Sequence, residues 1–278
     1  MASQLDKAKA FRALHERPGA FIIPNPWDAG TAKLLAAMGF EALATTSLGV
    51  ANMLGRTGVS QDMILDNARE IVAATGLPVS VDLENCGADT PKLASEAIRL
   101  AAEAGAVGGS IEDSTGNPKN PIYDFSLALE RVQAAVEVGR SLPIPFTLTA
   151  RAENFLHGRK DLDDTIKRLQ AFEAAGADVL YAPGLYDLAT IKTVVSALKK
   201  PFNLVTGFAD PSLTLDELSA AGVKRVSVGG ALSRVALAAF LKCVREMKDH
   251  GRFSFVREMA PIKDLKEAFA ANPPPTSM

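Results

Sequence analysis

The chain has 278 residues, of which 47% are hydrophobic and 22% are charged, and its formal net charge is −2. This length suffices for one large core or two modest ones. The charges are interspersed and form no basic stripe, so the sequence shows no electrostatic signature of a nucleic-acid or anionic-membrane partner. No segment reaches the roughly 18 uncharged apolar residues of a membrane span, and we expect none.

The two cysteines, Cys86 and Cys243, lie far apart, and neither has a partner at the spacing of a zinc finger or a redox motif. We therefore expect no disulfide framework. Residues 1–12 mix charged and small side chains and lack the apolar core of a signal peptide. These features predict a soluble, unprocessed protein in a reducing, cytoplasmic setting.

Short β-rich runs alternate with longer amphipathic segments along the chain, a pattern typical of a parallel sheet with crossover helices. Strands are predicted at residues 21–24, 42–46, 79–83, 108–111, 145–149, 178–181, 202–205 and 225–228. The helices between them include residues 29–38, 91–104, 163–175, 188–198 and 213–221. Four of these helices stop at a glycine just before a predicted strand, namely Gly39, Gly105, Gly176 and Gly222.

Eight such units fit about 230 residues, close to the usual length of a (β/α)8 barrel. An open doubly wound sheet is the alternative, but such a sheet more often carries a glycine-rich phosphate-binding fingerprint after its first strand. Here the first run continues as Asn25-Pro26-Trp27-Asp28, without that fingerprint. We therefore predict a single TIM-type (β/α)8 barrel over residues 1–245.

Residues 246–278 are predicted to form a C-terminal helical extension. They contain an amphipathic run at 262–269 and then the sequence Asn272-Pro273-Pro274-Pro275. The extra helix packs either on a neighbouring subunit or on its own barrel, and the sequence favours neither. We expect the proline-rich tail to be disordered.

Active-site groups of a barrel project from the C-terminal ends of the strands. These positions carry Asp82 and Glu84 after the third run, Glu112 after the fourth and Arg151 after the fifth. Asp82 and Glu84 lie two apart on extended chain, which would place both side chains on one face. Three carboxylates around one mouth require a neutralising cation, and oxygen-only ligands favour Mg²⁺ or Mn²⁺ over zinc. We therefore predict a metal site at these three acids.

A competing interpretation is that the acids after the strands cap the N-termini of helices. For Asp28 and Asp113 the sequence supports helix capping and a role in the site equally. Arg151 can bind a substrate carboxylate with two hydrogen bonds. It can also pair internally with Glu112 or Glu153, and the two roles are compatible.

Thr46, Ser47 and Leu48 follow the second run and form a predicted turn whose N–H groups could hold a carboxylate or an oxyanion. Cys86 lies in the loop after Glu84, but no histidine is near it in sequence, so we interpret it as a packed or exposed thiol rather than a nucleophile. The three histidines, His15, His157 and His250, are predicted on helices or loops. Of these, His157 alone lies near a strand end.

Several phrases that include these residues resemble the isocitrate lyase/phosphoenolpyruvate mutase superfamily, over about residues 11–244. They are Pro24-Asn25-Pro26-Trp27-Asp28-Ala29, Ala44-Thr45-Thr46-Ser47-Leu48-Gly49-Val50-Ala51, Val81-Asp82-Leu83-Glu84, Ile111-Glu112-Asp113 and Ala150-Arg151-Ala152-Glu153. The resemblance implies a barrel with Mg²⁺ at Asp82, Glu84 and Glu112. It also implies 2-oxo or 2-hydroxy carboxylate substrates, reaction through a metal-stabilised enolate, and a tetramer with exchanged C-terminal helices.

Two departures from that family pattern affect the substrate. Isocitrate and methylisocitrate lyases carry a Lys-Lys/Arg-Cys-Gly-His motif after the fourth strand, whereas residues 114–120 here read Ser-Thr-Gly-Asn-Pro-Lys-Asn. Their acid–base cysteine is missing. Arg56 stands where phosphonate-processing members and several lyases carry an aspartate, which weakens a mutase assignment and predicts a positive charge near the mouth.

We predict a Mg²⁺-dependent lyase that cleaves a C–C bond of a small 2-oxo or 2-hydroxy carboxylate. Asp82, Glu112 and Arg151 are assigned to catalysis. The predicted substrate-binding residues are Thr46, Ser47, Leu48, Asp82, Arg151 and Asn203. The alternatives are P–C bond chemistry, as in a phosphonate mutase or phosphonopyruvate hydrolase, and a non-catalytic carboxylate-binding protein on the same scaffold.

Overall fold

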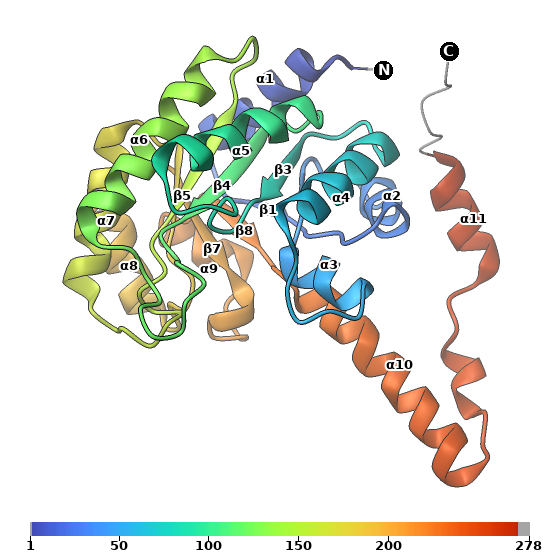
Figure 1. Cartoon of the computed structure of the whole chain (residues 1–278). Coiled ribbons are helices and arrows are strands. Elements are labelled where there is room, and N and C mark those ends of the chain that lie inside the picture. The colour runs from blue at the N-terminus through green and yellow to red at the C-terminus, as the bar shows by residue number, and fades with distance from the viewer. Residues whose placement is uncertain (1, 272–278) are drawn as a thin grey trace.

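The computed structural model describes residues 2–271 and shows eight parallel strands around one barrel (Figure 1). The strands are β1 (Phe21–Ile23), β2 (Leu43–Ala44), β3 (Val79–Asp82), β4 (Gly108–Glu112), β5 (Thr147–Arg151), β6 (Val179–Tyr181), β7 (Phe202–Val205) and β8 (Arg225–Ser227). They pair in the order β1-β8-β7-β6-β5-β4-β3-β2. The Ala44 N–H donates to the Pro24 carbonyl at 3.1 Å and so joins the two ends of this sheet. The predicted barrel is confirmed, and the open doubly wound sheet is wrong.

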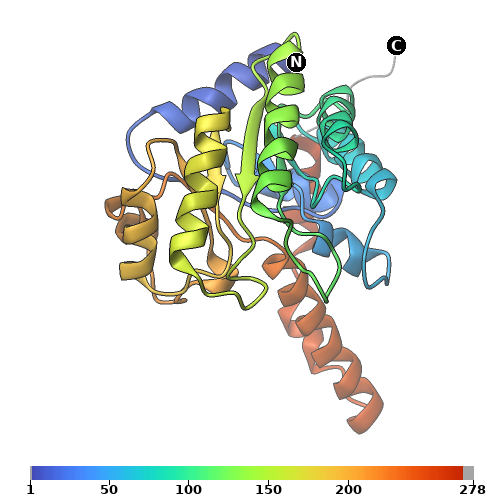
Figure 2. The same ribbon diagram turned by 60° about the vertical axis from the view of Figure 1, so that its left-hand side comes forward.

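The helices alternate with the strands and surround them on the outside (Figure 2). They are α1 (Gln4–Glu16), α2 (Ala29–Ala37), α3 (Ser47–Met53), α4 (Gln61–Ala74), α5 (Pro91–Glu103), α6 (Phe125–Ser141), α7 (Leu162–Ala175), α8 (Leu188–Ser196), α9 (Leu215–Ala220), α10 (Ala231–His250) and α11 (Ile262–Ala271), with 3₁₀ turns η1 (Thr206–Phe208) and η2 (Ser254–Glu258). Within residues 2–271, no helix combines the length and the apolar character that a membrane crossing requires.

The four predicted helix stops are confirmed by their backbone geometry. Each glycine has a left-handed φ, which is 86° at Gly39, 90° at Gly105, 106° at Gly176 and 88° at Gly222. The residue after the glycine donates back into the helix, as Ala106 does to the Ala101 carbonyl at 3.1 Å. These bonds satisfy the last helix carbonyls and turn the chain into the next strand.

Side chains alternate along each strand between an apolar shell and a polar interior. On β5, β7 and β8 the buried Leu148, Leu204 and Val226 belong to the core that packs against the helices. Their neighbours Thr149, Asn203 and Arg225 line a cavity inside the barrel. The barrel axis is therefore polar, and this polarity continues up to the strand ends.

The C-terminal segment leaves the barrel. α10 has 20 residues with Ser233 as its buried member, and it projects away from the strands (Figures 1 and 2). The chain then returns through η2, and α11 lies against α2 of the same chain. α10 runs through residue 245, where we placed the end of the barrel domain, and that division stays a prediction. The proline-rich tail lies outside the described residues.

Candidate active site at the barrel mouth

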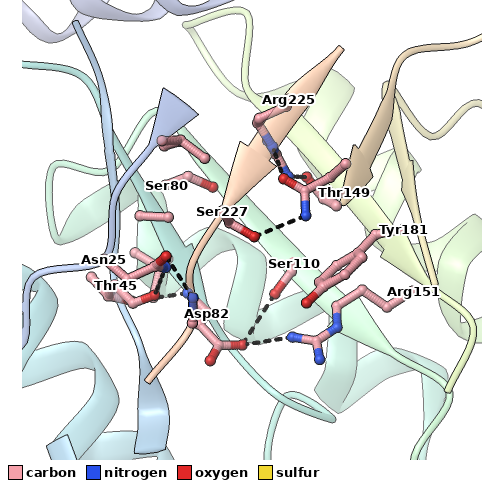
Figure 3. Close-up of a pocket in the computed structure, with 15 residues that line it drawn as sticks. Asn25, Thr45, Ser80, Asp82, Ser110, Thr149, Arg151, Tyr181, Arg225 and Ser227 are labelled. Atoms are coloured by element: carbon pink, nitrogen blue, oxygen red, sulfur yellow. Dashed lines mark hydrogen bonds and ion pairs between the residues drawn. The ribbon is translucent and has the colours of Figure 1, made fainter. Parts of the chain in front are cut away.

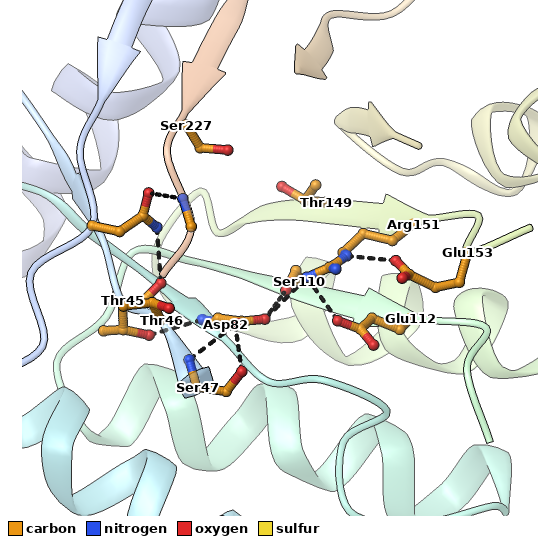
Figure 4. Close-up of polar contacts among 12 residues, drawn as sticks. Thr45, Thr46, Ser47, Asp82, Ser110, Glu112, Thr149, Arg151, Glu153 and Ser227 are labelled. Atoms are coloured by element: carbon orange, nitrogen blue, oxygen red, sulfur yellow. Dashed lines mark hydrogen bonds and ion pairs between the residues drawn. The ribbon is translucent and has the colours of Figure 1, made fainter. Parts of the chain in front are cut away.

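The predicted acids and the arginine meet at the C-terminal ends of three neighbouring strands (Figure 4). Asp82 ends β3, Glu112 ends β4 and Arg151 ends β5, and strand register places Glu112 directly opposite Arg151. All three line one open pocket, together with Glu84 and Ser47. The sequence-based grouping of these side chains around one mouth is therefore what the structure shows.

Arg151 is the centre of the ion-pair network. Its Nη1 donates to Glu112 Oε1 at 2.7 Å and to Asp82 Oδ1 at 3.1 Å, and its Nε donates to Glu153 Oε1 at 2.8 Å. The guanidinium also lies 4.5 Å from the ring centroid of Tyr181. Both internal pairs considered from the sequence are present, so the guanidinium is held rigidly at the strand ends.

The segment after β2 differs from the predicted turn. Thr46 is the N-cap of α3, because its hydroxyl accepts from the Gly49 N–H at 3.3 Å. Ser47 therefore lies in the first turn of a helix. Its N–H and its hydroxyl both donate to Asp82 Oδ2, at 3.1 and 2.9 Å. The free N–H groups of a helix start favour an anion, and here that anion is Asp82 itself.

The expected geometry of Glu84 is wrong, although its predicted location is confirmed. β3 ends at Asp82, and Glu84 has a left-handed φ of 51°, so the two carboxylates do not follow the alternation of an extended strand. The Cys86 N–H donates to the Leu83 carbonyl at 2.8 Å and closes this turn. Glu84 still lines the mouth, where burial and the nearby Asp82 raise the pKa of its carboxyl.

The mouth carries more negative than positive charge. Its lining contains four carboxylates, Asp82, Glu84, Glu112 and Glu153, and one guanidinium, Arg151. Burial raises the pKa of Glu112 well above its ordinary value, and the charges of Glu153 and Asp82 add to the increase while Arg151 opposes it. Glu153 is fully buried, and its Oε2 has no hydrogen-bond partner in the structure.

These observations test whether a divalent cation suits the mouth. The donors are all oxygens, the charge is in excess, and one buried carboxylate oxygen lacks a partner, so the chemistry fits Mg²⁺. In the described part of the chain, however, no three acidic, histidine or cysteine side chains are grouped closely enough to share an ion as they stand. Arg151 lies between Asp82 and Glu112, and cation binding would require these two carboxylates to turn away from it.

The two acids that we weighed as helix caps behave differently. Asp28 is the N-cap of α2 and accepts from the Thr31 N–H at 2.7 Å. Asp113 caps no helix, because it accepts from the Glu153 N–H at 2.7 Å and from Arg168 Nη1 at 3.0 Å. Burial raises the pKa of Asp113 to about 7. Through its bond with the Glu153 N–H, Asp113 holds the chain in place just after β5.

Asn203 lines the cavity inside the barrel, where Figure 3 labels Thr149, Arg225 and Ser227, and it is not among the residues that line the mouth. Its Oδ1 accepts from Arg225 Nε at 2.7 Å and its Nδ2 donates to Ser227 Oγ at 3.0 Å. Arg225 also donates to Thr149 Oγ1 at 2.9 Å, and burial, with the nearby Arg151, lowers its pKa to about 10. Both ends of the Asn203 amide are engaged, and its contact with substrate stays a prediction.

Two residues considered from the sequence take no part in the mouth. Cys86 is buried, and burial raises the pKa of its thiol to about 12. Like Cys243, it is a free thiol. The interpretation of Cys86 as a packed thiol therefore agrees with the structure. Arg56 is exposed after α3 and is not among the residues that line the mouth, so the positive charge expected there is missing.

A pair that the sequence did not single out joins the loops after β4 and β5. Ser114 Oγ and His157 Nε2 are 3.2 Å apart, and both side chains line the mouth. The residues are 43 positions apart in sequence. The only sequence signal was the proximity of His157 to a strand end, because no local spacing connects it with Ser114.

The family model described as phosphoenolpyruvate phosphomutase matches residues 11–248. The chain belongs to this family. Its expected membership of the isocitrate lyase/phosphoenolpyruvate mutase superfamily is thus confirmed, and so is the expectation of an enzyme related to the carbon–carbon lyases.

The similar proteins include both lyases and phosphonate enzymes. A crystal structure from Burkholderia cenocepacia J2315, named provisionally as a lyase/mutase, has 59% identity and a TM-score of 0.94, with 96% of each chain covered. A second structure from that organism, named provisionally as a phosphonomutase, has 33% identity and a TM-score of 0.81, covering 88% of this chain and 99% of that one. The 2-methylisocitrate lyase of Escherichia coli (strain K12) is 30% identical over 77% of this chain and 75% of its own.

Proposed function

We propose that the protein is a Mg²⁺-dependent lyase that cleaves a C–C bond of a small 2-oxo or 2-hydroxy carboxylate and releases one product as an enolate. Its superfamily consists of Mg²⁺-dependent lyases and mutases that act on C–C or P–C bonds. The observation that supports this proposal most is the position of Arg151, a guanidinium held between acids at the strand ends. Such a group is suited to bind and orient a carboxylate.

The residues of the mouth divide the work as follows. Asp82, Glu84 and Glu112 would hold the cation, which when bound supplies positive charge for an enolate oxygen. With these acids engaged by the cation, Arg151 Nη1 would bind the substrate carboxylate, and Glu153 would keep the Arg151 Nε in place. The Ser47 N–H, at the start of α3, now donates to Asp82 and would be the donor for a second anionic oxygen.

Isosteric variants at the mouth test the metal proposal. Asp82→Asn and Glu112→Gln keep side-chain size but remove the charge that a cation needs. We expect each to lower kcat on the best substrate of a carboxylate screen by roughly 100-fold or more, similar to losing one stabilising group at a developing charge. Chelation should lower the wild-type rate comparably. Asp66→Asn, at an exposed position of α4, is the matched control. Unchanged turnover in the two mouth variants would refute the metal site.

Phosphonate chemistry is the second candidate, and the 33% identity to a structure provisionally named as a phosphonomutase favours keeping it. A parallel assay of phosphonopyruvate, oxaloacetate and alkylated malates separates the two. Turnover confined to phosphonopyruvate would replace our proposal by the P–C alternative. Stabilisation by oxalate and Mg²⁺ without turnover of any acid would instead indicate a non-catalytic carboxylate-binding protein.

We further propose that the C-terminal arm, defined as residues 231–271, packs on another copy of the chain in a tetramer. α10 exposes large apolar side chains along its length, including Val235 at 67% and Phe240 at 62%. Phe240 and Leu237 border a groove that continues onto Trp27 and Met53 of the barrel. An exposed apolar surface of this kind is typical of a protein interface.

A further inference from the structure

The acids and the arginine of the mouth already have other tasks. Asp82, Glu112 and Glu153 all accept from Arg151, Glu84 is assigned with Asp82 and Glu112 to the proposed cation, and a guanidinium does not give up a proton in a protein. Tyr181 is buried, and burial raises the pKa of its hydroxyl further. An enolate formed at this mouth must nevertheless gain a proton to leave as a stable product.

Ser114 and His157 lie at the same mouth but outside the ion-pair network. Ser114 Oγ is 3.2 Å from His157 Nε2, and both residues line the pocket that Arg151 and Glu112 line. Ser114 is 8% exposed, so its hydroxyl is largely shielded from bulk water, whereas His157 is exposed. The serine therefore faces the site, and the imidazole connects it with solvent.

Backbone hydrogen bonds hold both loops in place. The His157 N–H donates to the Glu153 carbonyl at 3.1 Å, which continues the chain from β5 as a helical turn. Ser114 pairs with Ile122 in an antiparallel bridge, and the Thr115 N–H donates to the Pro121 carbonyl at 2.9 Å. The hydroxyl and the ring thus belong to two closed loops on the barrel rim.

We propose that Ser114 and His157 form the proton relay that completes the reaction, in place of the cysteine missing from residues 114–120. The Ser114 Oγ–H bond breaks as a C–H bond forms at the enolate carbon. The proton on His157 Nε2 moves to Ser114 Oγ and restores the hydroxyl, which leaves a neutral imidazole that takes a new proton from solvent. In the reverse direction the neutral imidazole accepts the serine proton while Ser114 Oγ accepts one from carbon.

This inference rests on the proposed function, and isotope exchange tests it without knowledge of the true substrate. In D₂O with Mg²⁺, the wild-type protein should exchange the carbon-bound protons next to a carboxyl or carbonyl group in pyruvate or succinate, followed by ¹H NMR. General acid–base groups commonly contribute 100-fold or more, so Ser114→Ala and His157→Gln should each slow exchange at least 100-fold. Ser114→Thr, which keeps a hydroxyl, should retain a rate within a few-fold of wild type.

Two further variants separate this inference from the metal proposal. His250→Gln removes an exposed histidine at the end of α10 and should exchange like wild type. Exchange at the wild-type rate in Ser114→Ala or His157→Gln would overturn the relay and leave the metal site standing. Relay variants that lose exchange while Asp82→Asn keeps it would support the relay and refute the metal. Exchange of neither acid by the wild-type protein would overturn the relay, while the turnover and chelation assays decide the metal site separately.

Added imidazole gives a further check on the role of the ring. In His157→Ala, millimolar imidazole should restore exchange by at least 10-fold if the ring transfers a proton through Ser114. The same addition should leave Ser114→Ala unchanged, because the missing group there is the hydroxyl. Restoration in both variants, or in neither, would contradict the order of the relay.

Discussion

His15 of α1 is a histidine that the fold keeps neutral. Its ring packs edge-on against Phe11 and Phe21, with centroid separations of 4.8 and 5.1 Å. Nδ1 lies 2.8 Å from the Phe11 carbonyl and so carries the proton, while Nε2 faces Arg225 Nη1 at 3.4 Å. Burial, together with the Arg225 charge, lowers the pKa of His15 from 6.5 to about 3.

This lowered pKa predicts acid sensitivity of the fold. Between about pH 6.5 and 3 the unfolded chain binds a proton at His15 that the folded protein does not, so the free energy of unfolding falls as the pH drops through that window. By about pH 4 the loss from this residue should reach roughly 3 kcal/mol. His15→Leu should flatten the decline in urea unfolding, measured between about pH 7 and 4.

The matched control for His15→Leu is the exposed His250. His250→Gln also removes one histidine, but this one is exposed at the end of α10. We expect it to show the full wild-type decline with falling pH. An equal decline in wild type and His15→Leu would show that other groups account for the acid sensitivity.

At the scale of single elements, the glycine helix stops differ in what surrounds them. Gly39 and Gly105 have nearly the same backbone angle, with φ of 86° and 90°. A Cβ at Gly39 would meet nothing within 4 Å, whereas one at Gly105 would lie 2.7 Å from Val72 Cγ1. The first glycine is therefore required by conformation alone and the second also by the close approach of α4.

Alanine at these two positions should separate the two requirements. Gly39→Ala should cost about 1–2 kcal/mol of unfolding free energy, the usual penalty of a left-handed non-glycine residue. Gly105→Ala should cost roughly 1–3 kcal/mol more because the added methyl overpacks against Val72. Urea unfolding measures the free energy of unfolding of both variants. Val72→Ala, made in wild type and in each glycine variant, shows whether the contact with Val72 causes the additional cost. Equal costs for the two glycine variants, or a Val72→Ala cost that Gly105→Ala does not reduce, would contradict the proposed contact.

For the molecule as a whole, the barrel was predictable because each unit repeats the same local information. An apolar strand run, an amphipathic helix and a glycine stop recur along the chain, so the order of elements follows from short windows of sequence. The grouping of Asp82, Glu112 and Arg151 was predictable for a related reason, because parallel strands end at one edge. The position of each residue along its strand therefore determined that these three side chains lie together at the mouth.

What the sequence left undetermined depends on tertiary geometry. Glu84 adopts a left-handed turn that its residue type disfavours, and no local rule indicates it. Ser114 and His157 meet only because the loops after β4 and β5 are neighbours in space. Asn203 was assigned to substrate, but its place inside the barrel depends on the register of β7 against β8 and on Arg225.

The C-terminal arm is expected to determine how copies of the chain assemble. Phe240 of α10 is 62% exposed and borders the groove between this helix and the barrel. An aspartate there would place a charge inside an interface that we propose to be apolar, and burial of an unpaired charge costs several kcal/mol per site. We expect the wild-type chain to have the mass of a tetramer in light scattering after size exclusion, and Phe240→Asp to have a lower one.

Leu93→Asp is the control for this experiment, because Leu93 is 55% exposed on α5, away from the arm. It should leave the mass unchanged, since the same charge then stays in solvent. A wild-type monomer, or an unchanged mass in Phe240→Asp, would contradict the proposed packing of α10 on another copy; α11 already contacts α2 of its own chain. Because Phe240 is not among the residues that line the mouth, Phe240→Asp should retain the proton exchange that we propose for Ser114 and His157.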